Sequence, residues 1–409
     1  MTDPITPSPS LAARIPRTVI ALGLVSFFMD VSSEIVHGLL PVFMTTTLGL
    51  SVAMVGLIDG VAESTASITK VFSGYISDRI GLRKPLILFG YGLSALTKPL
   101  FALAGGAGLI LGARFADRVG KGMRGAPRDA LITDVTPPEV RGRAFGLRQA
   151  MDTAGAFTGP LLALALMALF AGNMRAVFWV AVIPAALAVA CVLFGVEDRG
   201  ARVTDQAARV VKAPPIRLAD ISRFSADYWG VALLGVIFTL ARFSEGFLVL
   251  KAHADGLPLF LTPLVLVAMN IVYAAGAYPA GALSDRIKPE GLLLAGLAAL
   301  VAADLMLSLG QGLVATFAGI GLWGVHMALT QGLLSKLVAD HAPAELRGSA
   351  FGLFNLLTGL AMLLASVTAG LVWDRFGAPA TFITGGGFAL LAAGLVLIQR
   401  RGATASPMA

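Results

Sequence analysis

Charged residues that could bind a solute are concentrated in one short segment of an otherwise apolar sequence. Residues 113–134, ARFADRVGKGMRGAPRDALITD, carry seven formal charges within their first seventeen positions. At 100° per residue these side chains fall within an arc of about 140° on one helix face, opposite apolar residues. Because a charge near the bilayer centre costs roughly 2.5–3.5 kcal/mol, we expect this face to meet a wet cavity or opposite charges. The charged residues are Arg114, Asp117, Arg118, Lys121, Arg124, Arg128 and Asp129.

The basic residues of this stripe suit the binding of an anionic solute, because guanidinium and ammonium groups capture carboxylates and phosphates. The alternative is structural, with the same bases neutralising acids on neighbouring helices. In the second half of the chain, Arg242 and Glu245 would complete a site across the cavity. His326 is a further candidate because imidazole changes its charge near neutral pH, although it is also compatible with simple hydrogen bonding. The candidate substrate-binding residues are Arg114, Arg118, Lys121, Arg124, Arg242, Glu245 and His326.

Acidic residues inside apolar segments are the candidates for carrying a coupling proton. Asp30 and Glu34 lie four residues apart, on one helix face. Burial disfavours the charged form of a carboxylate, whereas a nearby base such as Arg118 favours it, so a structural ion pair is the alternative. The same alternative holds for Asp59 and Glu63, which share a helix with Lys70, and for Asp152, which lies four residues after Arg148. The candidate proton-coupling residues are Asp30, Glu34, Asp59, Glu63 and Asp152.

The composition indicates a membrane protein. The chain has 409 residues, of which 56% are hydrophobic and 13% charged, and its mean hydropathy is +0.82. A soluble protein carries roughly 25% charged residues. Cys191 is the single cysteine, which excludes an intrachain disulfide framework and a cysteine-based metal site. We expect no metal, no cofactor and, despite a formal charge of +7, no nucleic-acid partner.

Apolar runs of about 20 residues, each long enough to cross a bilayer, recur from end to end. They predict an all-α fold with twelve membrane spans at approximately 18–40, 52–76, 85–104, 109–132, 144–170, 177–196, 228–250, 259–283, 291–309, 314–338, 349–372 and 379–398. The predicted organisation is a cytoplasmic tail at 1–17, a six-helix bundle at 18–196, a cytoplasmic linker at 197–227, a second bundle at 228–398 and a cytoplasmic tail at 399–409.

The distribution of basic residues predicts the orientation of the chain in the membrane. One set of loops holds most of the Lys and Arg residues, whereas the opposite set holds only Arg175, Lys251 and Arg375. Because basic loops remain in the cytoplasm, both termini are expected there. We therefore expect a multi-pass protein of the cytoplasmic (inner) membrane.

The two halves of the sequence repeat each other. GYISDRI at 74–80 recurs as GALSDRI at 281–287, and PPEVRGRAFGL at 137–147 recurs as PAELRGSAFGL at 343–353. The offset of the second pair is 206 residues, and it aligns the charged segment with the apolar span at 314–338. The charged segment is therefore predicted to be the fourth membrane helix, not a loop.

These motifs resemble the major facilitator superfamily. The stretch GYISDRIGLRK at 74–84 resembles the signature G-x-L-a-D-R-x-G-R-K, and Arg114 lies where the family has an arginine in its fourth helix. The fifth span, from Gly146 to Pro160, is similar to a motif of proton-driven antiporters, but its closing Gly-Gly is Ala163-Leu164 here. The resemblance implies alternating access by two six-helix bundles around a cavity.

The resemblance and the positions in the predicted helices also imply gating and packing residues. The gating or motif residues are Gly74, Asp78, Arg79, Gly81, Arg83, Arg128, Asp129, Asp134, Asp285 and Arg286. Arg83 and Asp134 are the candidate ion pair of the gate. The helix-packing residues are Gly146, Gly155, Gly159 and Pro160.

The sequence thus favours a proton-coupled secondary transporter, not an enzyme, that exports a small charged or amphipathic organic solute. Its expected partners are this solute, protons and the lipid bilayer, and it is expected to act as a monomer. The first alternative is proton-coupled uptake of an anionic nutrient or a metal chelate, given five bases against two acids on the fourth helix. A membrane enzyme that binds a metal diphosphate is the alternative from another class, and the repeat argues against it.

Overall fold

A computed structural model of the chain describes residues 15–80, 82–198, 221–284, 287–330, 332–343 and 346–405. Within these ranges every regular element is helical, so the all-α prediction is confirmed. The first half contains α1 (Arg17–His37), α2 (Leu40–Val42), η1 (Phe43–Thr47), α3 (Val52–Ile80), α4 (Lys84–Leu103), α5 (Ala107–Val135), η2 (Pro138–Val140), α6 (Arg141–Leu169) and α7 (Met174–Gly195). The second half contains α9 (Ala226–Ala241), α10 (Gly246–Ala254), η4 (Leu259–Leu261), α11 (Leu264–Ser284), α12 (Pro289–Leu309), α13 (Gly312–Thr330), α14 (Leu333–His341), α15 (Arg347–Phe376) and α16 (Ala378–Ala405).

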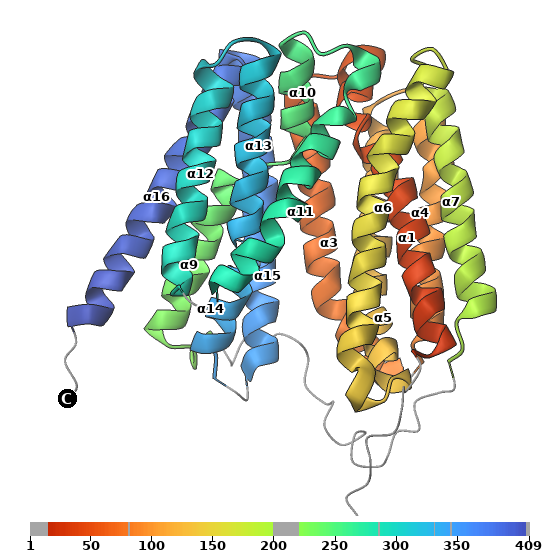
Figure 1. Ribbon diagram of the computed structural model, residues 1–409, viewed down its shortest axis with the longest axis horizontal. Coiled ribbons are helices and arrows are strands. Elements are labelled where there is room, and N and C mark those ends of the chain that lie inside the picture. The colour runs from red at the N-terminus through yellow and green to blue at the C-terminus, as the bar shows by residue number, and fades with distance from the viewer. Residues whose placement is uncertain are drawn as a thin grey trace, which may run out of the picture.

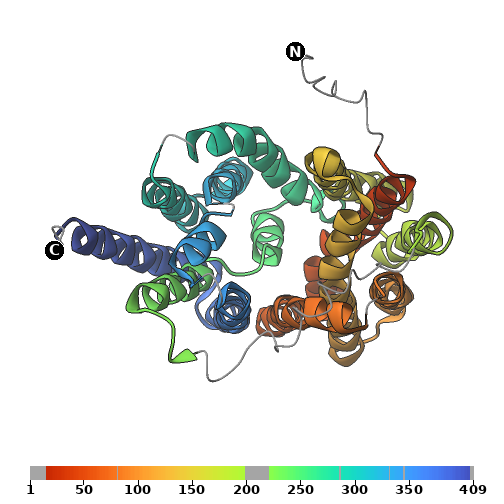
Figure 2. The same ribbon diagram turned by 90° about the horizontal axis from the view of Figure 1, so that it is seen from below.

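The helices form two groups that lie side by side. Figure 1 shows α1 to α7 on one side of the molecule and α9 to α16 on the other, and Figure 2 shows the same division with most helices seen end-on. We call the end at which α3 and α7 finish and α9 begins the linker end. The opposite end, where α3 begins and α15 finishes, is the far end. The chain crosses between these two ends repeatedly, as a multi-pass membrane protein must.

The charged segment is a helix within the first group. Eleven segments in the described ranges are long and apolar enough to cross a membrane, and α5 is not among them because of its charges. It is nevertheless a continuous helix of 29 residues that packs against α3 and α4. Gly90 and Gly120 let α4 and α5 approach closely, since a Cβ at Gly120 would lie 2.5 Å from the carbonyl oxygen of Gly90.

The predicted spans at 228–250 and 314–338 correspond to the membrane-length segments Ala226–Ala254 and Gly312–His341, but the helix within each segment is interrupted. The first is broken at residues 242–245, between α9 and α10. There the Ser244 hydroxyl accepts a hydrogen bond from the Gly246 amide at 3.1 Å and donates one to Asp59 at 2.8 Å. The second is broken between α13 and α14, where Gly332 has a φ of 76° that favours glycine. Hydropathy averaged over a membrane-length window did not reveal either break, because apolar residues lie on both sides of each one.

The far end is closed by contacts between the two groups of helices. The carboxylate of Asp374, near the end of α15, accepts hydrogen bonds from the amides of Val52 at 3.0 Å and Ala53 at 2.8 Å. A Cβ at Gly370 would lie 2.7 Å from the Cα of Ala53, so α3 and α15 touch along their backbones here. One turn further along α3, a Cβ at Gly56 would lie 3.0 Å from the carbonyl carbon of Ser366 in α15, so the close approach of the two helices continues.

Candidate substrate cavity

A cavity of about 380 Å³ lies between the two groups of helices. Its lining comes from α1, α3, α4, α5 and α6 on one side and from the 242–245 break, α11 and α15 on the other. The residues that line it are Asp30, Ser33, Glu34, Val36, His37, Glu63, Lys98, Phe101, Arg114, Asp117, Arg118, Lys121, Arg124, Ala156, Arg242, Phe243, Ser244, Glu245, Leu266, Asn270 and Met362. Five acids and six Lys or Arg residues are therefore gathered around one small volume.

The α5 wall of this cavity is basic. Arg114, Arg118, Lys121 and Arg124 all line the cavity, together with Asp117. Their spacing of three to four residues places them on one face of α5, as the helical periodicity predicted. These five of the seven charges meet the cavity, whereas Arg128 and Asp129 lie outside its lining and pair with each other. Partners and solvent therefore offset the cost of the charges in this helix.

Several of these charges are held in ion pairs. Arg118 pairs with Glu63 of α3 at 3.0 Å, between Nη2 and Oε1. Lys98 of α4, whose side chain is 1% exposed, pairs with Asp117 at 3.1 Å, and also donates a hydrogen bond to the Ser33 hydroxyl at 3.2 Å. Arg118 and Asp117 of the charged face are therefore neutralised by residues of neighbouring helices, as the structural alternative to solute binding predicts.

Arg114 reaches past the cavity to the second half of the chain through Asp59. The guanidinium Nη2 donates to Asp59 Oδ1 at 2.7 Å, and the Ser244 hydroxyl donates to Asp59 Oδ2 at 2.8 Å. Asp59 is 1% exposed and does not line the cavity. Asp59 therefore links Arg114 to the 242–245 break from a position outside the cavity lining.

Three charged groups of the lining have weaker compensation. Within the described ranges, neither Asp30 nor Lys121 makes an ion pair or a hydrogen bond through its side chain. Arg124 donates to the Ser94 hydroxyl at 2.7 Å, and its guanidinium lies 4.5 Å from the centroid of the Tyr91 ring. These three groups are therefore the most available for a solute or a proton.

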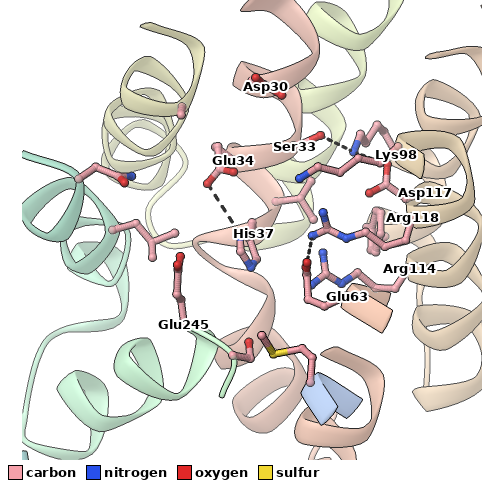
Figure 3. A pocket seen from close by; sticks show the side chains of 18 of the residues that line it. Asp30, Ser33, Glu34, His37, Glu63, Lys98, Arg114, Asp117, Arg118 and Glu245 are labelled. Carbon is pink, nitrogen blue, oxygen red and sulfur yellow. Dashed lines mark hydrogen bonds and ion pairs between the residues drawn. The ribbon is translucent and has the colours of Figure 1, made fainter. Parts of the chain in front are cut away.

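The remaining acids of the lining lie on the other side of the cavity from the bases of α5. Figure 3 shows Glu34 and His37 of α1 and Glu245 on one side, with Arg114 and Arg118 entering from the opposite side. The Nδ1 atom of His37 is 3.7 Å from Glu34 Oε2. Glu245 and Arg242 are 3.9 Å apart and each side chain is 27% exposed, which leaves both accessible from the cavity. Arg242 and Glu245 were expected on one helix, and they are instead the first and last residues of the 242–245 break.

Like Asp59, two further candidate residues lie outside the cavity. His326 is completely buried in α13, where its Nδ1 atom is 2.8 Å from the carbonyl oxygen of Gly296 and its ring stacks on Phe238. This placement corrects the expectation that His326 contacts a solute. Asp152 lies in α6 and pairs with Arg148 at 2.6 Å. It belongs to an ion-pair cluster with Arg128 and Asp129 and does not line the cavity.

The gating candidates lie at the linker end. Arg83 and Asp134 form the expected ion pair, with Nε and Oδ2 3.4 Å apart, and Arg83 also donates to the Ser77 hydroxyl at 2.6 Å. Arg128 pairs with its neighbour Asp129 at 3.2 Å. Of the other motif positions, Gly74 lies in α3 and faces Ala126 of α5, and Arg79 is exposed. The side chain of Asp78 and residues Gly81, Asp285 and Arg286 lie outside the described residues.

The packing glycines differ in their surroundings. A Cβ at Gly155 would lie 2.7 Å from the carbonyl oxygen of Phe27, and one at Gly159 would lie 2.5 Å from the Cβ of Glu34. Both therefore lie where α6 meets α1, directly behind the acidic side of the cavity. Pro160 is buried beside them, whereas Gly146 has no atom within 4 Å of its position for a Cβ.

Sequence reasoning missed several residues of the cavity. Lys98 of α4 contacts Asp117 of α5 and Ser33 of α1 at the edge of the cavity. Ser244 is a small polar residue, and its hydrogen-bond partner Asp59 lies 185 positions away in the sequence. Asn270 was detectable, because it is a polar amide in the apolar stretch LVLVAMNIVY. Among the described residues, no group of three or more His, Cys, Asp or Glu side chains is arranged to hold a metal ion.

Comparisons with known proteins agree with this architecture. The family model of the Major Facilitator Superfamily matches residues 22–366 and 266–407. An uncharacterized MFS-type transporter of Methanocaldococcus jannaschii is 31% identical over 395 residues, which cover 94% of this chain and 95% of that protein. The inner membrane transport protein YajR of Escherichia coli is 25% identical over 409 residues, covering 95% and 82% of the two chains.

A solved structure shows the same fold. The crystal structure of the nucleoside transporter NupG matches with a TM-score of 0.72 at 14% identity, over 94% of this chain and 98% of that one. The match to the family model and to the archaeal relative extends over nearly the whole chain, as does the agreement in fold. This chain is a member of the Major Facilitator Superfamily of membrane transporters.

Proposed function

We propose that the protein is a proton-coupled secondary transporter that moves a small charged organic solute through this cavity by alternating access. The observation that carries the proposal is the cavity itself, a space of about 380 Å³ between the two groups of helices and lined by side chains of both. A site at such an interface is exposed to one side of the membrane and then to the other when two rigid halves rock about it. The bundles at 18–196 and 228–398 are the proposed rigid halves.

The solute is proposed to carry an anionic group that binds to α5. Lys121 is exposed in the cavity and makes no ion pair in the described part of the chain. Arg124, one turn further, contacts a hydroxyl and an aromatic ring and forms no ion pair within the described residues. A carboxylate or phosphate between these two bases would gain charge-assisted hydrogen bonds without breaking an existing ion pair.

Asp30 is the proposed proton carrier. It lines the cavity on α1 and forms no ion pair with any described residue. Asp152, Lys121 and Arg124 are near enough to interact with it electrostatically. A bound anion at Lys121 would compete with Asp30 for the same positive charge, which gives a direct link between solute binding and protonation. Glu34 and Glu63 are weaker candidates because each has a basic partner.

The proposed location is the cytoplasmic membrane, with the linker end and both termini in the cytoplasm, as the basic loops indicate. In that orientation the closed far end would face outward, as expected of the inward-facing state in the proposed cycle. The motif in the fifth span favours export. Uptake of an anionic nutrient or metal chelate is the second candidate. Lys121 and Arg124 would bind an anion equally well whether transport is inward or outward.

The test uses the purified protein in vesicles with an imposed pH gradient and a panel of labelled organic cations, anions and metal chelates. We expect flux of an anionic or zwitterionic solute to depend on the gradient, and Asp30→Asn to remove this dependence. Lys121→Gln should weaken solute binding at least tenfold, whereas Lys70→Gln, which changes an exposed lysine outside the cavity, should not. Flux that ignores the gradient for every solute would exclude proton coupling, and full transport by Lys121→Gln would exclude the anion site.

A further inference from the structure

A second buried acid lies in the C-terminal half, far from the bases of α5. Asp304 of α12 is 1% exposed, and neither of its carboxylate oxygens has a hydrogen-bond partner among the described residues. An ionised carboxylate without a partner in a low-dielectric interior is destabilised by several kcal/mol. Asp304 nevertheless lies in the otherwise apolar part of α12, PEGLLLAGLAALVAADLMLSL. An apolar residue would pack there without this cost, so the presence of an acid points to a role other than packing.

We propose that Asp304 is a second protonation site of the transporter, which holds a proton in this conformation and releases it when the 242–245 break rearranges. The inference rests on the proposed proton-coupled function and extends it to the C-terminal half. On release, the O–H bond of the carboxylic acid breaks and the proton passes to a water molecule that reaches Asp304 from the cavity. The neutral acid is the form that the present surroundings of Asp304 tolerate.

The geometry connects Asp304 to the break through Gly385 of α16. A Cβ at Gly385 would lie 3.2 Å from Asp304 Oδ2, 2.9 Å from Cε1 of Phe243 and 3.4 Å from the carbonyl oxygen of Ala241. The absence of a side chain at Gly385 thus lets three groups converge on one point. Ala241 is the last residue of α9, and its carbonyl oxygen accepts no hydrogen bond from the backbone of the described residues beyond the helix. Carbonyl groups at the end of a discontinuous helix are suitable acceptors for an acidic proton.

Phe243 separates Asp304 from the cavity. Its side chain lines the cavity on one side and approaches Gly385 on the other. It also contacts the Trp323 ring, with centroids 5.6 Å apart, and the Phe382 ring at the same centroid distance. Because Phe243 lies within the break, any rearrangement that moves the break also moves this aromatic barrier. Water from the cavity would then reach Asp304.

No charged group in the surrounding elements compensates Asp304. Between Ala378 and Ile398, α16 contains no titratable residue, and α13 contains only His326, which is engaged with Gly296. In α14, which also contacts α12, the titratable residues are Lys336, Asp340 and His341. In the break, Arg242 and Glu245 face the cavity and pair with each other. Within the described residues none of these groups forms an ion pair with Asp304.

The test is infrared spectroscopy of the full-length protein in lipid vesicles, with pH as the only variable. The C=O stretch of a protonated carboxyl group is separate from the carboxylate bands. We expect wild type to show such a band that persists from mildly acidic to mildly alkaline pH, and Asp304→Asn to lose it. Asp227→Asn, which changes an exposed acid at the start of α9, should retain it. If Asp304→Asn does not fold, Asp304→Glu should shift the band and so assign it.

A second variant tests the role of the barrier. Phe243→Ala should make the same band disappear at alkaline pH, because water can then reach the acid from the cavity. The inference is overturned if the band is unchanged in folded Asp304→Asn, or if Phe243→Ala leaves it insensitive to pH. These outcomes are independent of the proposed function, which fails instead when solute flux in vesicles ignores the pH gradient. A response of flux to the gradient, without an Asp304 band, would overturn only the present inference.

Discussion

The contact of Asp374 with the start of α3 leads to a quantitative prediction about conformational balance. In this structure the Asp374 carboxylate accepts hydrogen bonds from the amides of Val52 and Ala53, across the two groups of helices. The first amides of a helix have no partner within the helix and carry partial positive charge, so a carboxylate is favourable there. This contact can form only when the far end is closed. Asp374→Ala should therefore destabilise the closed far end relative to an open one.

The expected size of the effect follows from the cost of losing a helix cap. Replacing a capping Asp by Ala costs about 0.5–2 kcal/mol, and water can partly replace a carboxylate at an exposed position such as this one. The population ratio of open to closed far ends should therefore rise by about 2- to 30-fold. Ser51 still caps the same helix through the Met54 amide, at 3.2 Å, so α3 itself should remain folded.

The change can be measured as a distance between spin labels on the two halves at the far end. Cys191 is the single cysteine of the chain, so Cys191→Ser provides a background for labels at Gly108 and Gln311. We expect Asp374→Ala to increase the fraction of long distances. Asp227→Ala is the matched control, because it removes an exposed carboxylate from the first turn of α9. A distance distribution identical in Asp374→Ala, the control and the parent would refute the idea that this contact holds the far end closed.

Two further predictions concern stability, measured as thermal unfolding of the purified protein in detergent. Gly159→Leu should reduce the free energy of unfolding by about 1–3 kcal/mol or prevent folding, because α6 cannot then approach α1. Gly146→Leu is the control and should be tolerated, because no atom lies within 4 Å of a Cβ at that position. Asp59→Asn should cost about 3–5 kcal/mol, because it leaves the Arg114 guanidinium buried without its counter-charge. Asp129→Asn, at a carboxyl side chain that is 44% exposed, should change the unfolding temperature little, and equal effects of the two Asp variants would contradict this account.

Much of the fold and part of the site were predictable because they depend on local patterns. Runs of apolar residues long enough to cross a bilayer predict membrane helices wherever they occur. The charges of α5 were predictable as one stripe turned away from lipid, because helical periodicity and the cost of charges in lipid depend on that segment alone. The predicted pair of Arg83 and Asp134 is present as well. It depended on a motif resemblance and not on physical reasoning about either residue.

The choice of partners was not predictable. Asp30, Glu34, Asp59 and Glu63 are all acids in apolar helices, and sequence periodicity treats them alike. Their different environments arise because Asp59 faces Arg114 and Ser244, whereas Asp30 faces open cavity. Those neighbours come from helices that are distant in the chain, and their relative positions depend on how α1, α3, α5 and the break pack together.

The sequence alone determined that this protein spans a membrane repeatedly, that its halves repeat and that one helix carries charge on a single face. Those properties follow from hydropathy, internal repetition and helical geometry, which are all local. Only the tertiary structure decided that the helix at 228–250 breaks at Ser244, because the stabilising acceptor is Asp59 of the other half. It likewise buried His326 away from the cavity and left Asp304 without a partner. Whether a buried polar group is a structural contact or a functional site depends on what surrounds it, and packing alone supplies those surroundings.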